Sequence, residues 1–219
     1  MFIELKDISV HYKRPVNCYA LNKLSLQVEK GEMIAIMGPS GCGKTTLINV
    51  LAGLTTITSG EYYYQNQLLS KDTSQLTKHR FENIGIVLQN FALLNDRNAL
   101  DNIRIGCKNK QDLRHVDKIT SEIGIKHRLK SYPYQLSGGE CQKVAIARAL
   151  ISEPSIILAD EPTGALDGNS SNEIMDLFEQ IHVKNRTIII VTHDKTVAER
   201  CTRIIQMKDG TIMQSTADG

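Results

Sequence analysis

Polar and apolar residues alternate in three segments near the N-terminus. The segments are Phe2–Tyr12, Leu24–Val28 and Glu61–Gln65. Alternation with a period of two predicts strands that bury one face and expose the other. We therefore expect an antiparallel β layer in the N-terminal third of the chain.

Four later segments are apolar throughout their length. They are Met33–Met37, Ile84–Leu88, Ser155–Ala159 and Thr187–Val191. Short continuous apolar runs are typical of parallel strands that helices cover on both faces. The sequence therefore predicts a second sheet, parallel and fully buried, as the core of an α/β fold.

Helical patterns separate these runs. The segment Thr46–Ala52 predicts a helix that Gly53 ends as a C′ residue. In Ser170–His182 the apolar residues fall on one helical face, and Ser170 with Glu173 predicts a capping box at its start. Pro154 is expected to separate a helix from the strand that follows it. Asp209-Gly210 predicts the turn of a C-terminal hairpin.

The segment from about Asn90 to Tyr134 has a different pattern. It is richer in charge, contains few buried-strand runs, and places Leu113, Val116 and Ile119 at helical spacing. We interpret residues 90–134 as a mostly helical subdomain, inserted into a single domain 1–219 whose core is formed by residues 1–89 and 135–219.

Charge and composition limit the partners. The net charge is +2 over 219 residues, and no Lys/Arg run stands out, which disfavours nucleic acid as a partner. The N-terminus lacks the pattern of a signal peptide, and the longest apolar runs are far below the ~20 residues that span a bilayer. A role at a membrane would require docking on another subunit. Five scattered cysteines without a CxxC pair indicate a reducing cytosol.

One motif indicates phosphate chemistry. Residues 38–45, GPSGCGKT, fit G-x-x-x-x-G-K-[ST] between a buried strand and a helix, the context that a P-loop requires. Lys44 is expected to reach the β- and γ-phosphates, and the Thr45 hydroxyl to bind Mg²⁺. The residues predicted to contact the nucleotide here are Gly38, Pro39, Ser40, Gly41, Cys42, Gly43, Lys44, Thr45 and Thr46. The Cys42 thiol is either oxidation-sensitive or simply a small side chain at this position.

Polar side chains follow the other buried strands. Asp160 and Glu161 end one, Gln89 follows another, and His193 comes shortly after a third. The carboxyl ends of parallel strands meet at one sheet edge, where ligands of α/β proteins gather. We predict that Asp160, with Thr45 and Gln89, holds Mg²⁺, and that Glu161 and His193 act near the γ-phosphate together with Lys44.

A second glycine-containing loop precedes the next predicted helix. Its sequence is LSGGE, with Ser137, Gly138, Gly139 and Glu140 as candidate phosphate contacts. With this loop the motifs resemble, in order, those of the ATP-binding subunit of ABC transporters. The resemblance makes LSGGE the signature, Gln89 the Q-loop, Gly164–Asp167 the D-loop and His193 the H-loop. It also implies that Tyr12 stacks on adenine, with Tyr19 as the alternative.

The resemblance carries further expectations. Two chains would pair head to tail with ATP and Mg²⁺ between one chain's P-loop and the other's signature. Each chain would work as a peripheral subunit on the cytoplasmic face of the cell membrane, driving a transmembrane permease. Within the family, the chain is similar to the LolD/MacB group and to ATPases of bacteriocin or antimicrobial-peptide exporters, so the cargo would be a peptide, lipoprotein or drug.

Two alternative functions accompany this interpretation. A soluble ABC ATPase not coupled to transport is one alternative, although the chain lacks the long coiled coils usual in that class. A P-loop kinase or GTPase is the other, but it leaves LSGGE unexplained and the guanine motif N/T-K-x-D is missing.

The chain departs from the family pattern at two positions. Many relatives have Gln where this chain has Glu140, and Arg where it has Lys143.

Overall fold

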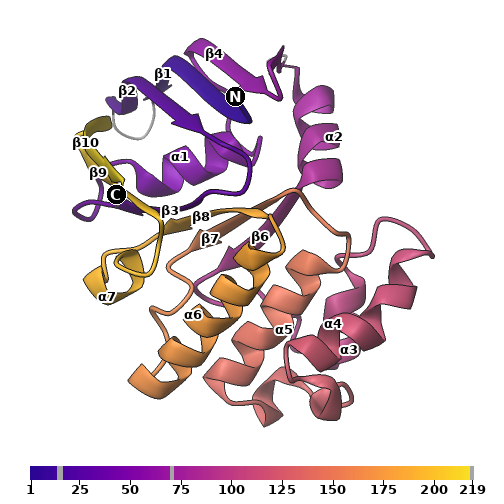
Figure 1. Ribbon diagram of the computed structural model, residues 1–219. Helices are drawn as coiled ribbons and strands as arrows, with labels where there is room; N and C mark the ends of the chain where they lie inside the picture. Colours follow the sequence, from indigo (N-terminus) through magenta and orange to yellow (C-terminus); the bar gives the residue numbers. More distant parts are fainter. Residues whose placement is uncertain (14–16, 70–71, 218–219) are drawn as a thin grey trace.

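The residues that the structure describes form two sheets (Figure 1). The computed structural model describes residues 1–13, 17–69 and 72–217. The first sheet is antiparallel, with the strand order β2-β1-β4-β5. Its strands are β1 Ile3–Tyr12, β2 Cys18–Val28, β4 Ser59–Tyr64 and β5 Gln67–Leu68. The predicted N-terminal antiparallel layer is confirmed, although β2 begins six residues before the predicted segment.

The second sheet has six strands in the order β10-β9-β3-β8-β7-β6. Adjacent strands from β9 to β6 are parallel, and β10 pairs with β9 in the antiparallel direction at the edge. The strands are β3 Met33–Met37, β6 Ile84–Leu88, β7 Ile156–Asp160, β8 Thr187–Val191, β9 Arg203–Lys208 and β10 Thr211–Ala217. All four predicted parallel strands are present, to within one residue at each end.

Both faces of this sheet are covered. Helix α1, Lys44–Leu51, lies between the two sheets, whereas α5, Gly138–Leu150, and α6, Gly168–Val183, cover the opposite face (Figure 1). Side chains of each central strand alternate between the two hydrophobic clusters, as Ile188 and Ile189 do in β8. Because both faces are covered, these strands are apolar except at a few positions such as Asp160 and Thr187 at their ends, which explains the continuous hydrophobic runs.

Two predicted turns are confirmed by their backbone geometry. Gly53 has a φ of +63° and donates to the Val50 carbonyl at 2.9 Å, while Leu54 donates to Asn49 at 2.8 Å. This pair of bonds is the Schellman motif that ends α1. Asp209 and Gly210 both have positive φ, as the predicted two-residue turn between β9 and β10 requires.

The predicted capping box of α6 is wrong. The N-cap is Asp167, whose carboxylate accepts from the Ser170 N–H at 2.9 Å. Glu173 does not reach back to the helix start, because it pairs with Lys143 of α5 at 2.8 Å. The helix begins two residues earlier than the pattern indicated, because Asp167 supplies the N-cap oxygen that was expected from Ser170.

Helix α2, Thr73–Asn83, was not predicted. Among its side chains only Leu76 and His79 are buried, so it shows no apolar stripe that a 3.6-residue period would reveal. It starts at Asp72, whose carboxylate accepts from the Gln75 N–H, and lies beside the edge of both sheets (Figure 1).

Short helices occupy the segment 90–134. They are α3 Ala99–Arg104, α4 Val116–Glu122 and the 3₁₀ turns η1 Asp112–His115, η2 Lys126–Arg128 and η3 Pro133–Gln135. Helices α3 and α4 lie beside α5 (Figure 1). The fully buried Asn102 side chain donates to the carbonyls of Leu94, Arg97 and Asn98 and so fixes the chain before α3.

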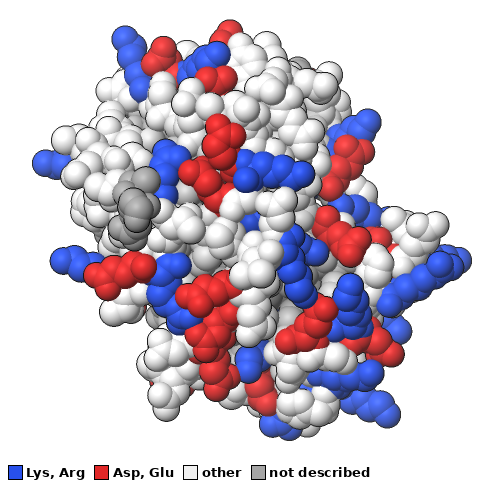
Figure 2. Space-filling view, in the orientation of Figure 1, with Lys and Arg blue, Asp and Glu red and all other residues white. Residues whose placement is uncertain are grey.

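The remaining helix α7, Lys195–Ala198, follows β8. On the face shown in Figure 2, basic and acidic side chains are interspersed. Among the described residues, no helix is long and apolar enough to cross a bilayer. The overall fold class, an α/β parallel-sheet core with an N-terminal antiparallel layer and an inserted group of helices, agrees with the prediction.

Candidate active site

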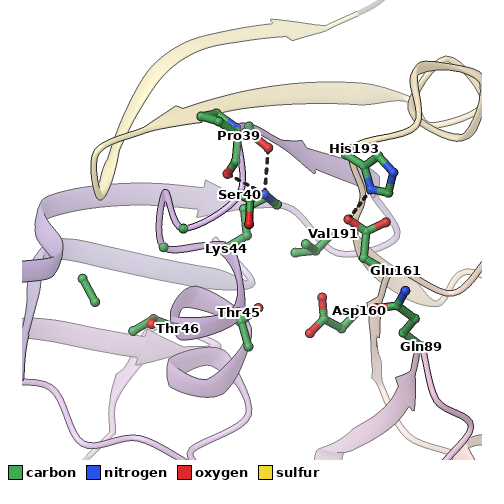
Figure 3. Close-up of a pocket in the computed structure, with 14 residues that line it drawn as sticks. Pro39, Ser40, Lys44, Thr45, Thr46, Gln89, Asp160, Glu161, Val191 and His193 are labelled. Carbon is green, nitrogen blue, oxygen red and sulfur yellow. Dashed lines mark hydrogen bonds and ion pairs between the residues drawn. The ribbon is translucent and has the colours of Figure 1, made fainter. Parts of the chain in front are cut away.

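A cavity of about 640 Å³ lies at the carboxyl edge of the parallel sheet. Strands β3, β8, β7 and β6 are parallel neighbours, so the segments that follow them converge there. Figure 3 shows the side chains that border the cavity. The lining residues are Ala20, Gly38, Pro39, Ser40, Gly41, Gly43, Lys44, Thr45, Thr46, Gln89, Asp160, Glu161, Val191 and His193.

The loop between β3 and α1 forms one wall of the cavity. Gly43 has a φ of +106° immediately before the helix, and a Cβ there would lie 2.3 Å from the Ala20 carbonyl oxygen. Only glycine fits this turn. No side chain caps the start of α1, so its first N–H groups are available to an anion in the cavity.

Lys44 is held at this loop. Its ammonium group donates to the Gly38 carbonyl at 2.7 Å and to the Pro39 carbonyl at 2.9 Å (Figure 3). The two bonds keep the positive charge at the cavity wall, where it meets any phosphate that the loop binds.

Oxygen ligands face the loop from the strand ends. Asp160, the last residue of β7, lies across the cavity from Thr45 and beside Gln89 (Figure 3). Burial and the neighbouring Glu161 raise the pKa of Asp160, while Lys44 and a hydrogen bond from Thr45 act in the opposite direction.

This ligand set fits Mg²⁺ together with a nucleotide. A carboxylate, a hydroxyl and an amide oxygen are all hard ligands, and Mg²⁺ in nucleotide sites takes few protein ligands because phosphate oxygens and water complete its octahedron. Within the described residues, no group of three or more His, Cys, Asp or Glu forms a metal cage. A carboxylate, a hydroxyl and an amide oxygen at one cavity edge suit a metal that arrives with its phosphates.

Glu161 is fixed by three contacts. Its backbone has a φ of +47°, and its N–H donates to the Val191 carbonyl at 2.8 Å. The Thr192 hydroxyl donates to Oε2 at 3.3 Å, and His193 Nδ1 lies 2.8 Å from Oε1 (Figure 3). The hydrogen bond with Glu161 raises the pKa of His193. The carboxylate is thus oriented by residues of the adjacent strand end, beside the cavity.

Two predicted nucleotide contacts, Cys42 and Tyr12, lie outside the cavity lining, as does Tyr19, the alternative to Tyr12. The Cys42 side chain is 4% exposed and packs in the hydrophobic cluster between the sheets. Tyr12 and its alternative Tyr19 are on the paired ends of β1 and β2, where Tyr19 stacks on His11 with ring centroids 4.4 Å apart. Their neighbour Ala20 does line the cavity, so this hairpin end borders it.

The LSGGE loop also lies outside the cavity. Ser137 is the N-cap of α5, and its Oγ accepts from the Glu140 N–H at 3.2 Å. The Glu140 carboxylate accepts from the Ser137 N–H at 2.9 Å, which completes a capping box. Because Ser137 Oγ acts as an acceptor in this bond, the hydroxyl proton remains available for an anion outside the chain.

Comparison with known proteins identifies the family. The profile of the family described as ABC transporter matches residues 21–164, which include the P-loop, the LSGGE loop and Asp160-Glu161. The chain belongs to the ABC transporter family. It is an ATP-binding cassette, the ATPase domain of that family.

Relatives of this ABC cassette include macrolide export proteins. It is 40% identical over 223 residues to the macrolide export ATP-binding/permease protein MacB of Hyphomonas neptunium, covering 99% of this chain and 35% of that protein. MacB of Vibrio parahaemolyticus is 42% identical over 202 residues, covering 90% of this chain and 31% of the relative. The cassette thus spans about a third of these relatives, and the predicted resemblance to the LolD/MacB group is confirmed.

Solved ABC cassettes share the fold. A dimeric structure of MJ0796, a bacterial ABC transporter cassette, matches with a TM-score of 0.89 and 37% identity over 100% of both chains. The dimeric post-hydrolysis state of MJ0796 bound to ADP and Pi has a TM-score of 0.89 and 36% identity, also over 100% of both chains.

The cassette's site contains residues that sequence reasoning missed. Ala20 and Val191 line the cavity, and Thr192 bonds to Glu161. Gln142, fully buried in α5, donates to the Pro162 carbonyl at 2.6 Å, beside Glu161. Thr192 had a detectable signal, because it comes directly after a predicted strand at the ligand edge. Ala20 and Gln142 had none, since only tertiary packing brings them near.

Proposed function

We propose that two copies of this chain hydrolyse ATP as a head-to-tail dimer. The observation that carries the proposal is the separation of the two loops that are expected to bind phosphate. The P-loop, the carboxylates and His193 line one cavity, whereas the signature Ser137–Glu140 lies outside it at the start of α5. A second chain brings its signature to this cavity. The dimeric structure of the cassette MJ0796 supports a dimer.

The residues around the cavity have different roles in ATP binding and hydrolysis. The loop N–H groups and Lys44 bind the phosphates, and Thr45, Asp160 and Gln89 hold Mg²⁺, which when bound neutralises charge on the phosphate oxygens. Glu161, held by Thr192 and His193, orients the attacking water and accepts its proton. His193 also contacts the γ-phosphate, and Tyr12 stacks on the adenine. The backbone of Cys42 follows the loop around the phosphates, with its thiol turned to the core.

If a dimer is the active species, turnover depends on protein concentration. We expect the ATPase activity per chain to rise with concentration and then to level off when the dimer is complete. The measurement is phosphate release at saturating MgATP while the concentration of the wild-type chain is varied over a hundredfold range. A constant activity per chain from a species that light scattering shows to be monomeric would contradict the proposal.

We further propose that the dimer drives a transmembrane permease from the cytoplasmic face of the cell membrane. The segment 90–134, treated as a helical subdomain on the core, would receive the permease. The MacB relatives are macrolide export proteins that combine an ATP-binding part with a permease, which supports extrusion of a drug. Our proposal also includes a lipoprotein or a peptide, bacteriocin-type peptides among them, as cargo.

The permease is testable in the native membrane. We expect a tagged chain, solubilised with mild detergent in the presence of ATP, to retain an integral membrane protein that mass spectrometry identifies. A variant that cannot bind nucleotide, Lys44→Ala, serves as the comparison for ATP-dependent retention. Purification without any membrane protein would favour the soluble ABC ATPase instead.

A further inference from the structure

Glu140 places a carboxylate beside the signature. It is the third residue of α5, the helix whose N-terminus carries Ser137, Gly138 and Gly139. Under the proposed function this helix end faces the triphosphate bound by the other chain. An ionised carboxylate near that helix end repels the phosphate unless a cation neutralises it.

The structure supplies that cation from a 3₁₀ turn that precedes the signature in the sequence. Arg128, the last residue of η2, donates from Nε to Glu140 Oε1 at 2.7 Å. The other oxygen, Oε2, accepts from the Ser137 N–H at 2.9 Å. His127 lies farther away, with Nε2 4.0 Å from Oε1. Each carboxylate oxygen therefore has a partner, and one of the partners is a full positive charge.

The balance of these contacts keeps Glu140 ionised. Burial raises the pKa of Glu140, but the hydrogen bond from Arg128 and the N–H of Ser137 together lower it below its ordinary value. The Glu140 side chain is 20% exposed, against 42% for Arg128. The pair is half-buried at the helix end, where solvent screens it less than a surface ion pair.

We propose that Arg128 is a positioning residue for the signature. It neutralises Glu140 and holds its carboxylate in the capping box, so that Ser137 presents its hydroxyl, and α5 its N–H groups, to phosphate without a nearby net negative charge. This inference rests on the proposed function of the signature as the cap of the partner's ATP. It assigns to the segment 90–134 a contribution to nucleotide binding as well as to permease docking.

A double-mutant cycle tests the proposal. The full chain is compared as wild type, Arg128→Gln, Glu140→Gln and the double variant, and kcat and KM for MgATP are measured at low and high salt. We expect Arg128→Gln to raise KM about tenfold in the wild-type background. In the Glu140→Gln background the same substitution should change KM less than twofold, because no charge remains to neutralise.

Salt and a conservative variant separate electrostatics from folding. The KM defect of Arg128→Gln should shrink as salt screens the repulsion. Arg128→Lys should restore most of the affinity, since it keeps the charge. As a matched control, Arg104→Gln removes another arginine of the segment 90–134, paired with Asp101 at 3.1 Å on α3. It is expected to leave KM within about twofold of wild type, as a surface pair should.

The outcomes distinguish this inference from the proposed function. Equal effects of Arg128→Gln in both Glu140 backgrounds, independent of salt, would assign Arg128 to fold stability alone and overturn the inference. If Ser137→Arg abolishes hydrolysis while the cycle shows no coupling, only the positioning role of Arg128 fails. If Ser137→Arg hydrolyses ATP normally, the signature role fails and this inference fails with it. Thermal unfolding, monitored by circular dichroism, tests whether each variant is folded.

Discussion

Replacing Glu161 with glutamine is expected to lower ATP turnover by about 10²- to 10⁴-fold, the usual contribution of a general base. Glutamine keeps the shape of the side chain and can still accept from Thr192, but it cannot take a proton from water. The Lys44 loop, Thr45 and Asp160 are untouched, so nucleotide binding persists. Since ATP then stays in the interface, the dimer should become longer-lived than that of the wild type.

Two measurements check this expectation. Phosphate release gives the loss of turnover, and size-exclusion chromatography with light scattering in MgATP gives the gain of dimer. Glu122→Gln is a matched control, because Glu122 lies on α4 and pairs with Lys184 at 2.8 Å, away from the cavity lining. Turnover of Glu161→Gln at the wild-type rate would remove Glu161 from the chemistry.

Replacing Ser137 with arginine is expected to abolish both dimer formation and hydrolysis while leaving ATP binding by the isolated chain nearly intact. The new side chain is too large for a closed interface against phosphate. Loss of the N-cap acceptor itself costs only about 1 kcal/mol, a small part of the roughly 5–15 kcal/mol that stabilises a typical native protein. Because Ser137 lies outside the cavity of its own chain, the P-loop still binds nucleotide.

Binding of a fluorescent ATP analogue tests whether the isolated chain still binds nucleotide. Light scattering tests whether the dimer is lost. Adding Glu161→Gln to the same chain removes hydrolysis and makes the dimer easier to detect, so the dimer-breaking effect can be read separately. Ser121→Arg provides the control, since Ser121 is exposed on α4. If the monomeric Ser137→Arg chain fails to bind ATP, the signature belongs to the chain's own site and the head-to-tail dimer is wrong.

Local patterns predicted the fold in detail where the signal lies in consecutive residues. The run Met33–Met37 gave a buried strand because both faces of β3 pack against hydrophobic clusters. Gly53 and Asp209-Gly210 marked their turns because those backbone angles suit few other residues. Helix α2 was missed, since its buried side chains are too few to produce a period.

The candidate site was predictable for a related reason. Gln89, Asp160 and Glu161 follow parallel strands, and parallel strands bring their carboxyl ends to one edge. The partner of each side chain was not predictable. Glu173 was expected to cap α6 but pairs with Lys143, because helix packing places that lysine closer than the helix start.

The family, the parallel core, the P-loop motif and a second glycine-containing loop at a helix start could all be recognised from the sequence. All of these depend on spacing along the chain and on backbone preferences that are local. Three features required the folded structure: Thr192 and His193 hold Glu161, Cys42 turns inward, and Arg128 neutralises Glu140. Contacts of this kind join segments that are separated along the sequence, and their geometry is set by how helices and strands pack rather than by any neighbouring residue.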